Sequence, residues 1–206
     1  MGKNEEIVLS LKKRFPDAGC TLAFHNDYEC LVSIILSAQT TDKSVNLVTP
    51  KLFKDFPSPK ELSGASIDSI ENDIKSLGLY HDKAKHLSLL GKELEARFAG
   101  IIPHDKKALM SLPGVGNKTS GVFLLERGDV PAIPVDTHVG RVSVRLGLTK
   151  EGDEPIEKEK KLEKTFKKED WSFLHHALIA FGREICHAKN PACESCPLRE
   201  YCHFKK

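Results

Sequence analysis

The sequence predicts an all-α fold made of two helical parts. Apolar residues recur at helical spacing along nearly the whole chain of 206 residues, as Ile67, Ile70 and Ile74 illustrate. No stretch alternates apolar and polar residues for long enough to predict a strand. The segment 130–135 contains two prolines and cannot be helical, so it is the best candidate for a linker between two helical lobes.

Each helix is predicted from its apolar periodicity and from residues that start or stop helices. Asp27, Ser66 and Asp105 are good N-cap residues, because their side chains accept hydrogen bonds from the first N–H groups of a helix. Pro16 would end the first helix. These signals predict helices over about 7–15, 27–38, 42–53, 67–77, 82–98, 105–112, 117–127, 137–147, 154–168 and 171–186.

Composition and charge exclude several classes of protein. Apolar residues make up 40% and charged residues 29%, which is ordinary for a globular protein and unlike a disordered one. The longest dense apolar run, 30–36, is too short to cross a bilayer, and the N-terminal residues lack the features of a secretory signal. Residues 104–150 hold 7 Lys/Arg against 4 Asp/Glu, which is compatible with a surface that faces phosphates. We therefore expect a cytoplasmic protein.

A two-glycine turn lies between two short predicted helices, at 112–119 (LPGVGNKT). Gly114 and Gly116 let the backbone approach a ligand closely, and the unpaired N–H groups at the following helix start suit a phosphate. The spacing from Gly114 to the Lys-Thr pair is too short for a Walker loop. A helix–turn–helix corner, in which the glycines serve geometry alone, is the alternative interpretation.

Lys118 falls in the first turn of the helix after this turn. A lysine that attacks carbon must be unprotonated, which the positive end of a helix and partial burial both favour. A contact between this ammonium and a phosphate is the other interpretation, and the residue alone favours it.

Asp136 directly follows the proline segment and is a strong N-cap candidate for the next helix. A carboxylate so placed stays ionised, because helix N–H groups stabilise its charge, and it could balance a positive charge that develops nearby. His138 and Arg141 on the same helix are expected to serve packing and phosphate contacts.

Four of the six cysteines lie near the C-terminus in the pattern Cys-x6-Cys-x2-Cys-x5-Cys. Without an export signal they indicate metal ligands rather than disulfides. Zinc ribbons usually supply two Cys-x2-Cys pairs and this run has one, so an iron–sulfur cluster is favoured and zinc is the alternative. Lys189, within these loops, could meet phosphates, whereas Cys20 and Cys30 are expected to fill space. The four candidate ligands are Cys186, Cys193, Cys196 and Cys202.

Five motifs in this order resemble the endonuclease III family of DNA glycosylases, within the helix-hairpin-helix superfamily. They are LSAQTTD at 36–42, GLYHDKA at 78–84, LPGVGNKT at 112–119, VDTHVGRV at 135–142 and the cysteine run. The resemblance implies two helical lobes flanking a DNA cleft. One is a six-helix barrel domain with the helix-hairpin-helix, residues 21–130. The other joins residues 1–20 to 131–206 and carries a [4Fe–4S] cluster on the four cysteines.

The resemblance also implies a bifunctional DNA glycosylase and AP lyase that removes oxidised pyrimidines from double-stranded DNA. Lys118 would be the nucleophile and Asp136 its catalytic partner, while Gln39 and Leu79 would enter the space left by the flipped base. A monomer in a prokaryotic cytoplasm is expected, acting on damaged bases or abasic sites. Asn117 departs from the family, because many relatives carry a basic residue there. The implied DNA-binding residues are Gln39, Asp42, Leu79, Gly114, Val115, Gly116, His138, Arg141 and Lys189.

Three alternatives remain at this point. An adenine glycosylase without lyase activity would usually carry Ser or Tyr at position 118 and an added C-terminal domain. A non-catalytic DNA-binding module would use the two-glycine turn for phosphates only. An iron–sulfur electron carrier would need neither that turn nor Gln39.

Overall fold

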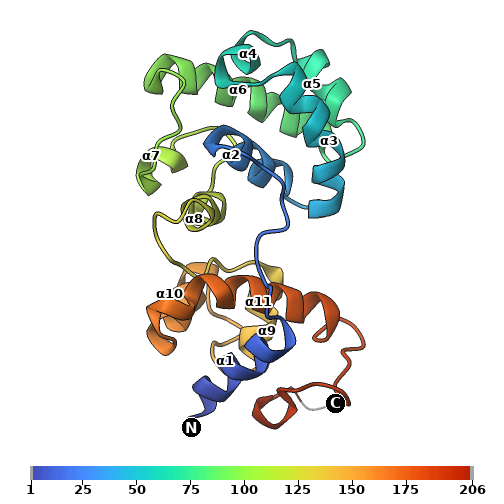
Figure 1. The fold of residues 1–206 in the computed structure, drawn as a ribbon, viewed down its shortest axis with the longest axis vertical. Coiled ribbons are helices and arrows are strands. Elements are labelled where there is room, and N and C mark those ends of the chain that lie inside the picture. The colour runs from blue at the N-terminus through green and yellow to red at the C-terminus, as the bar shows by residue number, and fades with distance from the viewer. Residues whose placement is uncertain (1, 205–206) are drawn as a thin grey trace. The chain divides into compact units, whose positions relative to one another are not determined.

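The computed structural model describes residues 2–204 and consists of helices and loops. These residues form eleven α-helices and two short 3₁₀ helices, without a β-strand, which confirms the predicted all-α fold. The chain divides into two compact units, coloured along the chain in Figure 1. We call Thr21–Asp129 the hairpin unit, and Met1–Cys20 together with Val130–Lys206 the cysteine unit. The predicted division into a barrel domain at 21–130 and a discontinuous domain at 1–20 and 131–206 stays a prediction.

The hairpin unit is built around α2, which is buried along almost its whole length. Helix α2 packs against α3 and α8, while α6 packs against α4 and α5. The approach of α6 to α4 is so close that a Cβ on Gly91 would lie 2.7 Å from the backbone nitrogen of Ser63. Its seven helices are α2 (Asp27–Leu36), α3 (Asp42–Asp55), α4 (Pro59–Gly64), α5 (Ile67–Ile74), α6 (Tyr80–Phe98), α7 (Lys106–Met110) and α8 (Asn117–Glu126).

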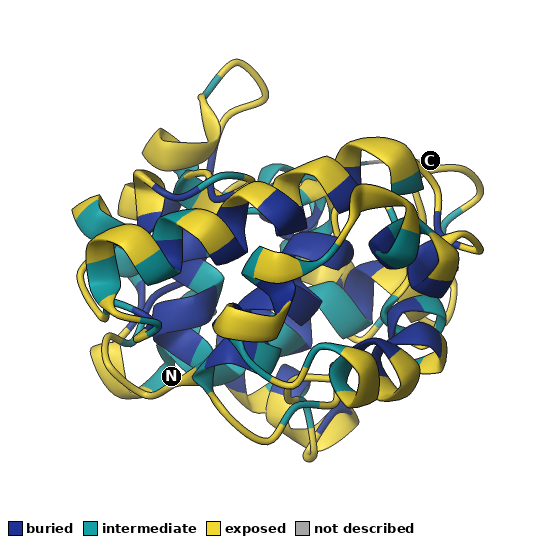
Figure 2. Cartoon of the chain, turned by 90° about the horizontal axis from the view of Figure 1, so that it is seen from above, coloured by how far each residue is buried: buried dark blue, intermediate teal, exposed yellow. Residues whose placement is uncertain are grey.

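The cysteine unit is built on α11, which packs against α9 and α1. Its core joins apolar residues from both ends of the sequence, among them Ile7, Leu11 and Phe181. In Figure 2 the buried residues form stripes along single faces of the helices, as amphipathic packing requires. The helices of this unit are α1 (Lys3–Arg14), α9 (Thr137–Arg145), α10 (Pro155–Thr165) and α11 (Trp171–Glu184), with 3₁₀ turns η1 (Lys168–Asp170) and η2 (Arg199–Tyr201).

The helix ends test the predicted caps. The Ser66 and Asp105 side chains accept hydrogen bonds from the N–H groups of Ser69 and Ala108, as predicted. The predicted cap Asp27 is wrong by one residue: the Asn26 side chain accepts from the Glu29 N–H, and Asp27 is the first helical residue. Helix α4 was not predicted, because six residues are too few to show a helical period.

Three further features can be compared with the sequence predictions. The proline-containing segment 130–135 is not helical, as predicted. Among the residues described, no helix combines the length and the apolar character needed to cross a lipid bilayer. Cys30 is buried and fills space, whereas Cys20 is exposed, contrary to expectation.

Candidate functional site

The two-glycine turn of the hairpin unit joins α7 to α8. Gly114 adopts φ +77°, a left-handed conformation that favours glycine. A Cβ at this position would also lie 3.3 Å from atoms of both His86 and Ile35. Val115 is buried and its N–H donates to the carbonyl of Leu112 at 3.1 Å, which anchors the turn in the core. Packing and backbone geometry therefore both favour glycine at position 114.

Helix α8 begins at this turn without a side-chain cap, since its N-cap residue is Gly116. Five of the seven helices in the hairpin unit are capped by a side chain, and only α6 and α8 are not. The first N–H groups of a helix have no partner within it. These two helix starts therefore keep backbone donors and a positive dipole end available for an anion.

Lys118 lies in the first turn of α8 and is exposed. The partial burial expected from the sequence is therefore absent within the hairpin unit. Its nucleophilic role stays a prediction.

Three exposed residues of the hairpin unit adopt left-handed backbone conformations although they are not glycine: Ala99, at the end of α6, and two residues on turns. Gln39, between α2 and α3, has φ +54°, and Leu79, the N-cap of α6, has φ +59° and is 55% exposed. Such conformations cost on the order of 1–3 kcal/mol each and cluster at functional sites. Gln39 and Leu79 are both predicted to enter the space that a flipped base leaves in the duplex. Asp42, the first residue of α3, is half-buried and accepts a hydrogen bond from the Thr21 hydroxyl.

In the cysteine unit, Asp136 caps α9 as predicted. Its Oδ1 accepts a hydrogen bond from the Val139 N–H at 2.7 Å, and its side chain is half-buried. The helix N-terminus thus holds the carboxylate in one orientation, as a catalytic carboxylate requires. Lys118 and Asp136 belong to different units, and their predicted partnership stays a prediction.

The predicted DNA contacts on α9 have partners inside the cysteine unit. The Arg141 guanidinium donates to the carbonyls of Cys186 at 3.0 Å and Gly182 at 2.9 Å, and lies 3.1 Å from the Nδ1 of His138. Burial lowers the pKa of His138, against the opposing attraction of Asp136. Arg141 therefore ties α9 to the end of α11, and its contact with DNA stays a prediction.

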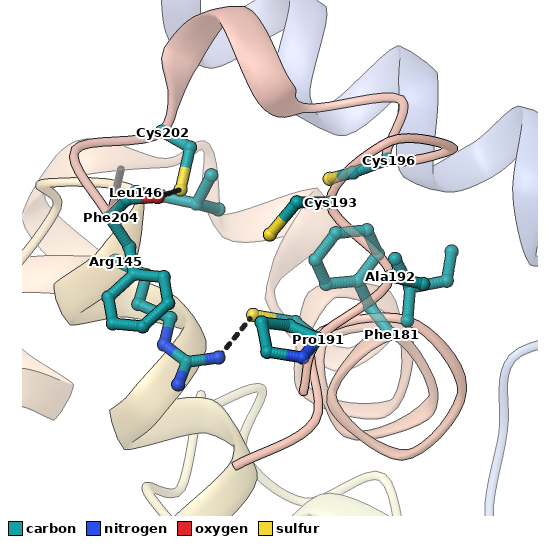
Figure 3. Close-up of a pocket in the computed structure, with 11 residues that line it drawn as sticks. Arg145, Leu146, Phe181, Pro191, Ala192, Cys193, Cys196, Cys202 and Phe204 are labelled. Atoms are coloured by element: carbon teal, nitrogen blue, oxygen red, sulfur yellow. Dashed lines mark hydrogen bonds between the residues drawn. The ribbon is translucent and has the colours of Figure 1, made fainter. Parts of the chain in front are cut away.

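The four cysteines line one pocket at the end of the cysteine unit (Figure 3). Its wall is completed by apolar side chains such as Leu146, Phe181 and Phe204, and Lys189 lies exposed in the loop between the first two cysteines. No three Cys, His, Asp or Glu side chains among residues 2–204 converge closely enough to hold a single metal ion. Four cysteine sulfurs around one pocket are the donor set that an iron–sulfur cluster requires.

Arg145, which the sequence interpretation missed, reaches the same pocket. Its guanidinium donates to the Cys186 sulfur at 3.2 Å and to the His187 carbonyl at 2.7 Å. It also stacks over the Phe204 ring at 4.0 Å (Figure 3). The sequence offered one signal, an arginine on the α9 face four residues after Arg141, but nothing that connected this face to the cysteines.

Comparisons with known proteins agree on one family. The model of the HhH-GPD superfamily of base excision DNA repair proteins matches residues 32–168, and the model of the iron–sulfur binding domain of endonuclease III matches residues 186–202. Endonuclease III of Bacillus subtilis (strain 168) is 45% identical over 188 residues, covering 91% of this chain and 86% of the relative. The chain belongs to the endonuclease III family. Endonuclease III of Escherichia coli (strain K12) is 36% identical over 204 residues, covering 99% and 96%.

Solved structures agree with this family. A trapped endonuclease III–DNA covalent intermediate has a TM-score of 0.93 and 43% identity, covering 98% of this chain and 97% of the other. A thermostable thymine-DNA glycosylase, 22% identical with a TM-score of 0.87, shares the fold. This chain is a bifunctional DNA glycosylase and AP lyase of base excision repair. Family membership excludes the adenine glycosylase, the non-catalytic module and the electron carrier.

Membership in the endonuclease III family also identifies the cofactor. The endonuclease III iron–sulfur domain spans the four cysteines, so they bind a [4Fe–4S] cluster, and the zinc alternative is wrong. The four cysteines would hold the cluster in a loop that has little regular structure, since η2 is the only helical turn in 187–202. Glycine at 182 allows the adjoining approach of α11 to α9, because a Cβ there would lie 2.9 Å from that of His138.

Proposed function

We propose that this enzyme excises oxidised pyrimidines from double-stranded DNA and nicks the strand 3′ to the resulting abasic site. A damaged base leaves the stack at a lower cost than an intact one, which exposes its C1′. Gln39 and Leu79, exposed on strained turns, would fill the space left in the duplex. The enzyme would act as a monomer at the DNA of a prokaryotic cytoplasm.

The phosphates beside the lesion would bind at the uncapped start of α8. Gly114, Val115 and Gly116 would present their backbone there, in keeping with the close approach that a two-glycine turn permits. Asp42, His138, Arg141 and Lys189 would supply further contacts, with Asp42 and His138 near the base pocket.

Lys118 would act as the nucleophile. Its neutral amine attacks C1′, the bond to the base breaks, and the base departs with the bonding electrons and takes up a proton. The sugar ring opens as O4′ leaves C1′, which gives a protonated imine. That imine acidifies the C2′ proton; its removal expels the 3′ phosphate, and water then releases Lys118. Asp136 would stabilise the positive charge on the sugar and assist proton transfer.

One observation carries this proposal. Lys118 is exposed in the first turn after a two-glycine hairpin, in a chain that is 43% identical to a protein trapped covalently on DNA. A lysine is the side chain that forms such a trapped adduct through an imine.

Borohydride trapping tests the proposal. The enzyme should form a covalent adduct with a duplex that contains thymine glycol or an abasic site, and Lys118→Ala should abolish the adduct, because no amine remains to form the imine. Lys92→Ala, which removes an exposed lysine of α6, is the matched control and should trap normally. An adduct with Lys118→Ala would show that another residue is the nucleophile.

A further inference from the structure

A lysine is buried in the hairpin unit between the two strained turns. Lys83, in the first turns of α6, is 5% exposed, although lysine is almost never buried without a charged partner. Its ammonium donates to the Thr40 hydroxyl, and no described carboxylate lies within ion-pair distance of it. Burial lowers its pKa, and no neighbouring acid opposes this effect. A buried charge with a single neutral partner costs stability, so stability does not explain its presence.

Thr40, the residue after Gln39, forms hydrogen bonds to residues that precede Gln39. The Thr40 hydroxyl accepts from Lys83 and donates to the Ala38 carbonyl at 3.4 Å, and the Thr40 N–H donates to the Ser37 carbonyl at 3.1 Å. Ala38 and Thr40 are the neighbours of Gln39 on either side. The left-handed backbone of Gln39 is therefore fixed at both flanks, and Lys83 supports the flank that lies toward α6.

Lys83 is also part of the other strained turn. Its N–H donates to the Leu79 carbonyl at 3.0 Å, which is the first hydrogen bond of α6. Leu79 has no side-chain cap to stabilise this helix start. Lys83 thus donates a backbone hydrogen bond to the Leu79 turn and a side-chain hydrogen bond to the Gln39 turn. Hydrogen bonds of one residue therefore connect the two turns.

We propose that Lys83 is a positioning residue, which ties the Gln39 turn to the Leu79 turn through Thr40 and so holds both exposed side chains ready to enter the duplex. This inference rests on the proposed role of Gln39 and Leu79 at the flipped base. Lys83 touches neither DNA nor the reacting atoms in this role. It sets the spacing between two side chains that must enter one gap together, and small displacements of such groups cost large factors in rate.

Amide hydrogen exchange in the free enzyme tests the positioning directly. Lys83→Met keeps the apolar stem and removes the ammonium. It should accelerate exchange in the turns around Gln39 and Leu79 and leave the interior of α2 unchanged. Lys83→Arg should restore protection, and Lys92→Met, on an exposed part of the same helix, should match wild type. Unchanged exchange in Lys83→Met would overturn the inference whatever the role of the two turns.

The consequence for repair is measured on two substrates. Lys83→Met and Thr40→Val should each slow base release from a thymine-glycol duplex by about tenfold or more. They should leave β-elimination at an abasic site in single-stranded DNA within about twofold, since no duplex gap must be filled there. Their combination should be no worse than either alone, because both break one link. Equal losses on both substrates, or none on either, would contradict the inference.

A fluorescent base separates this inference from the proposed function. 2-Aminopurine opposite an abasic analogue in duplex DNA reports unstacking when the gap is entered. Gln39→Ala and Leu79→Ala should reduce that signal, and failure of both variants to do so would refute their proposed role. If both reduce the signal and Lys83→Met does not, the role of the two turns stands and the positioning by Lys83 is wrong. Thr40→Val carries the test if Lys83→Met does not fold.

Discussion

The two units hold their functional loops in different ways. In the hairpin unit, the turns at Gln39, Leu79 and Gly114 are short, and densely packed helices fix each of them. In the cysteine unit, the segment 187–202 contains one 3₁₀ turn, and Leu198 is its fully buried side chain. The first unit maintains strained backbone by packing, whereas the second relies on sulfur ligands around a pocket. Loss of the cluster should therefore affect the cysteine unit, whereas relief of backbone strain should affect the hairpin unit.

Removal of a cluster ligand should have the largest effect on stability. Cys196→Ser should abolish the broad visible absorption and the bound iron, and lower the free energy of unfolding of the cysteine unit by more than about 4 kcal/mol, as the loss of a structural metal does. Hydrogen exchange should rise in α9 and α11 and stay unchanged in α6. Cys20→Ser, outside the cluster, is the control. Wild-type protection of α11 in an iron-free variant would contradict this division between the units.

Relief of strain should separate stability from function in the hairpin unit. Leu79→Gly removes a left-handed non-glycine residue that is 55% exposed, so little burial is lost. It should leave thermal stability equal or raised by about 0.5 kcal/mol, because relieved strain is partly offset by unfolded-state entropy, and should reduce base release from duplex DNA. Ala99→Gly, at φ +50° on the other end of α6, is the matched control and should not alter base release. A large destabilisation by Leu79→Gly would show that the left-handed conformation of Leu79 does not cost stability.

The smallest effect concerns an imidazole between two carboxylates in the hairpin unit. The ring nitrogens of His104 lie 2.8 Å from Asp27 and 2.6 Å from Asp129, and both can donate only when the ring is protonated. The hydrogen bond to Asp27, first among several effects, raises the pKa of His104. This contribution is complete below the unfolded pKa of about 6.5 and is lost as pH rises through the higher folded value.

His104→Gln should therefore destabilise the unit more at pH 5.5 than at pH 8.5, by less than about 1 kcal/mol, since the ring is 39% exposed. Chemical denaturation at the two pH values measures the difference. Equal destabilisation at both would mean that the ring acts as a neutral donor.

The sequence predicts those features that depend on local patterns. Apolar periodicity and short polar caps give the helices, and the Asp136 cap follows from one residue after a proline segment. Asn26 and Asp27 are adjacent and equally good caps, so the pattern cannot choose between them. The spacing of the cysteines gives the metal ligands, and the family motifs give the type of cluster.

What the sequence did not reveal depends on neighbours distant along the chain. Lys83 resembles any surface lysine of an amphipathic helix until α6 places it beside Thr40. Arg145 meets the Cys186 sulfur only after α9 and α11 pack together. Left-handed Gln39 and Leu79 carry no glycine signal, because tertiary packing imposes their conformations.

Along the sequence, the hairpin unit lies between the two segments that form the cysteine unit. This order determines when each helix becomes available during synthesis. Helix α1 leaves the ribosome before α11, on which it packs and which follows more than a hundred residues later. At roughly 5–20 residues per second, that delay lasts on the order of 10–30 s. The apolar face of α1, with Ile7 and Leu11, must stay uncovered while the hairpin unit is completed. The nascent chain therefore exposes the apolar face of α1 until α11 has been synthesised.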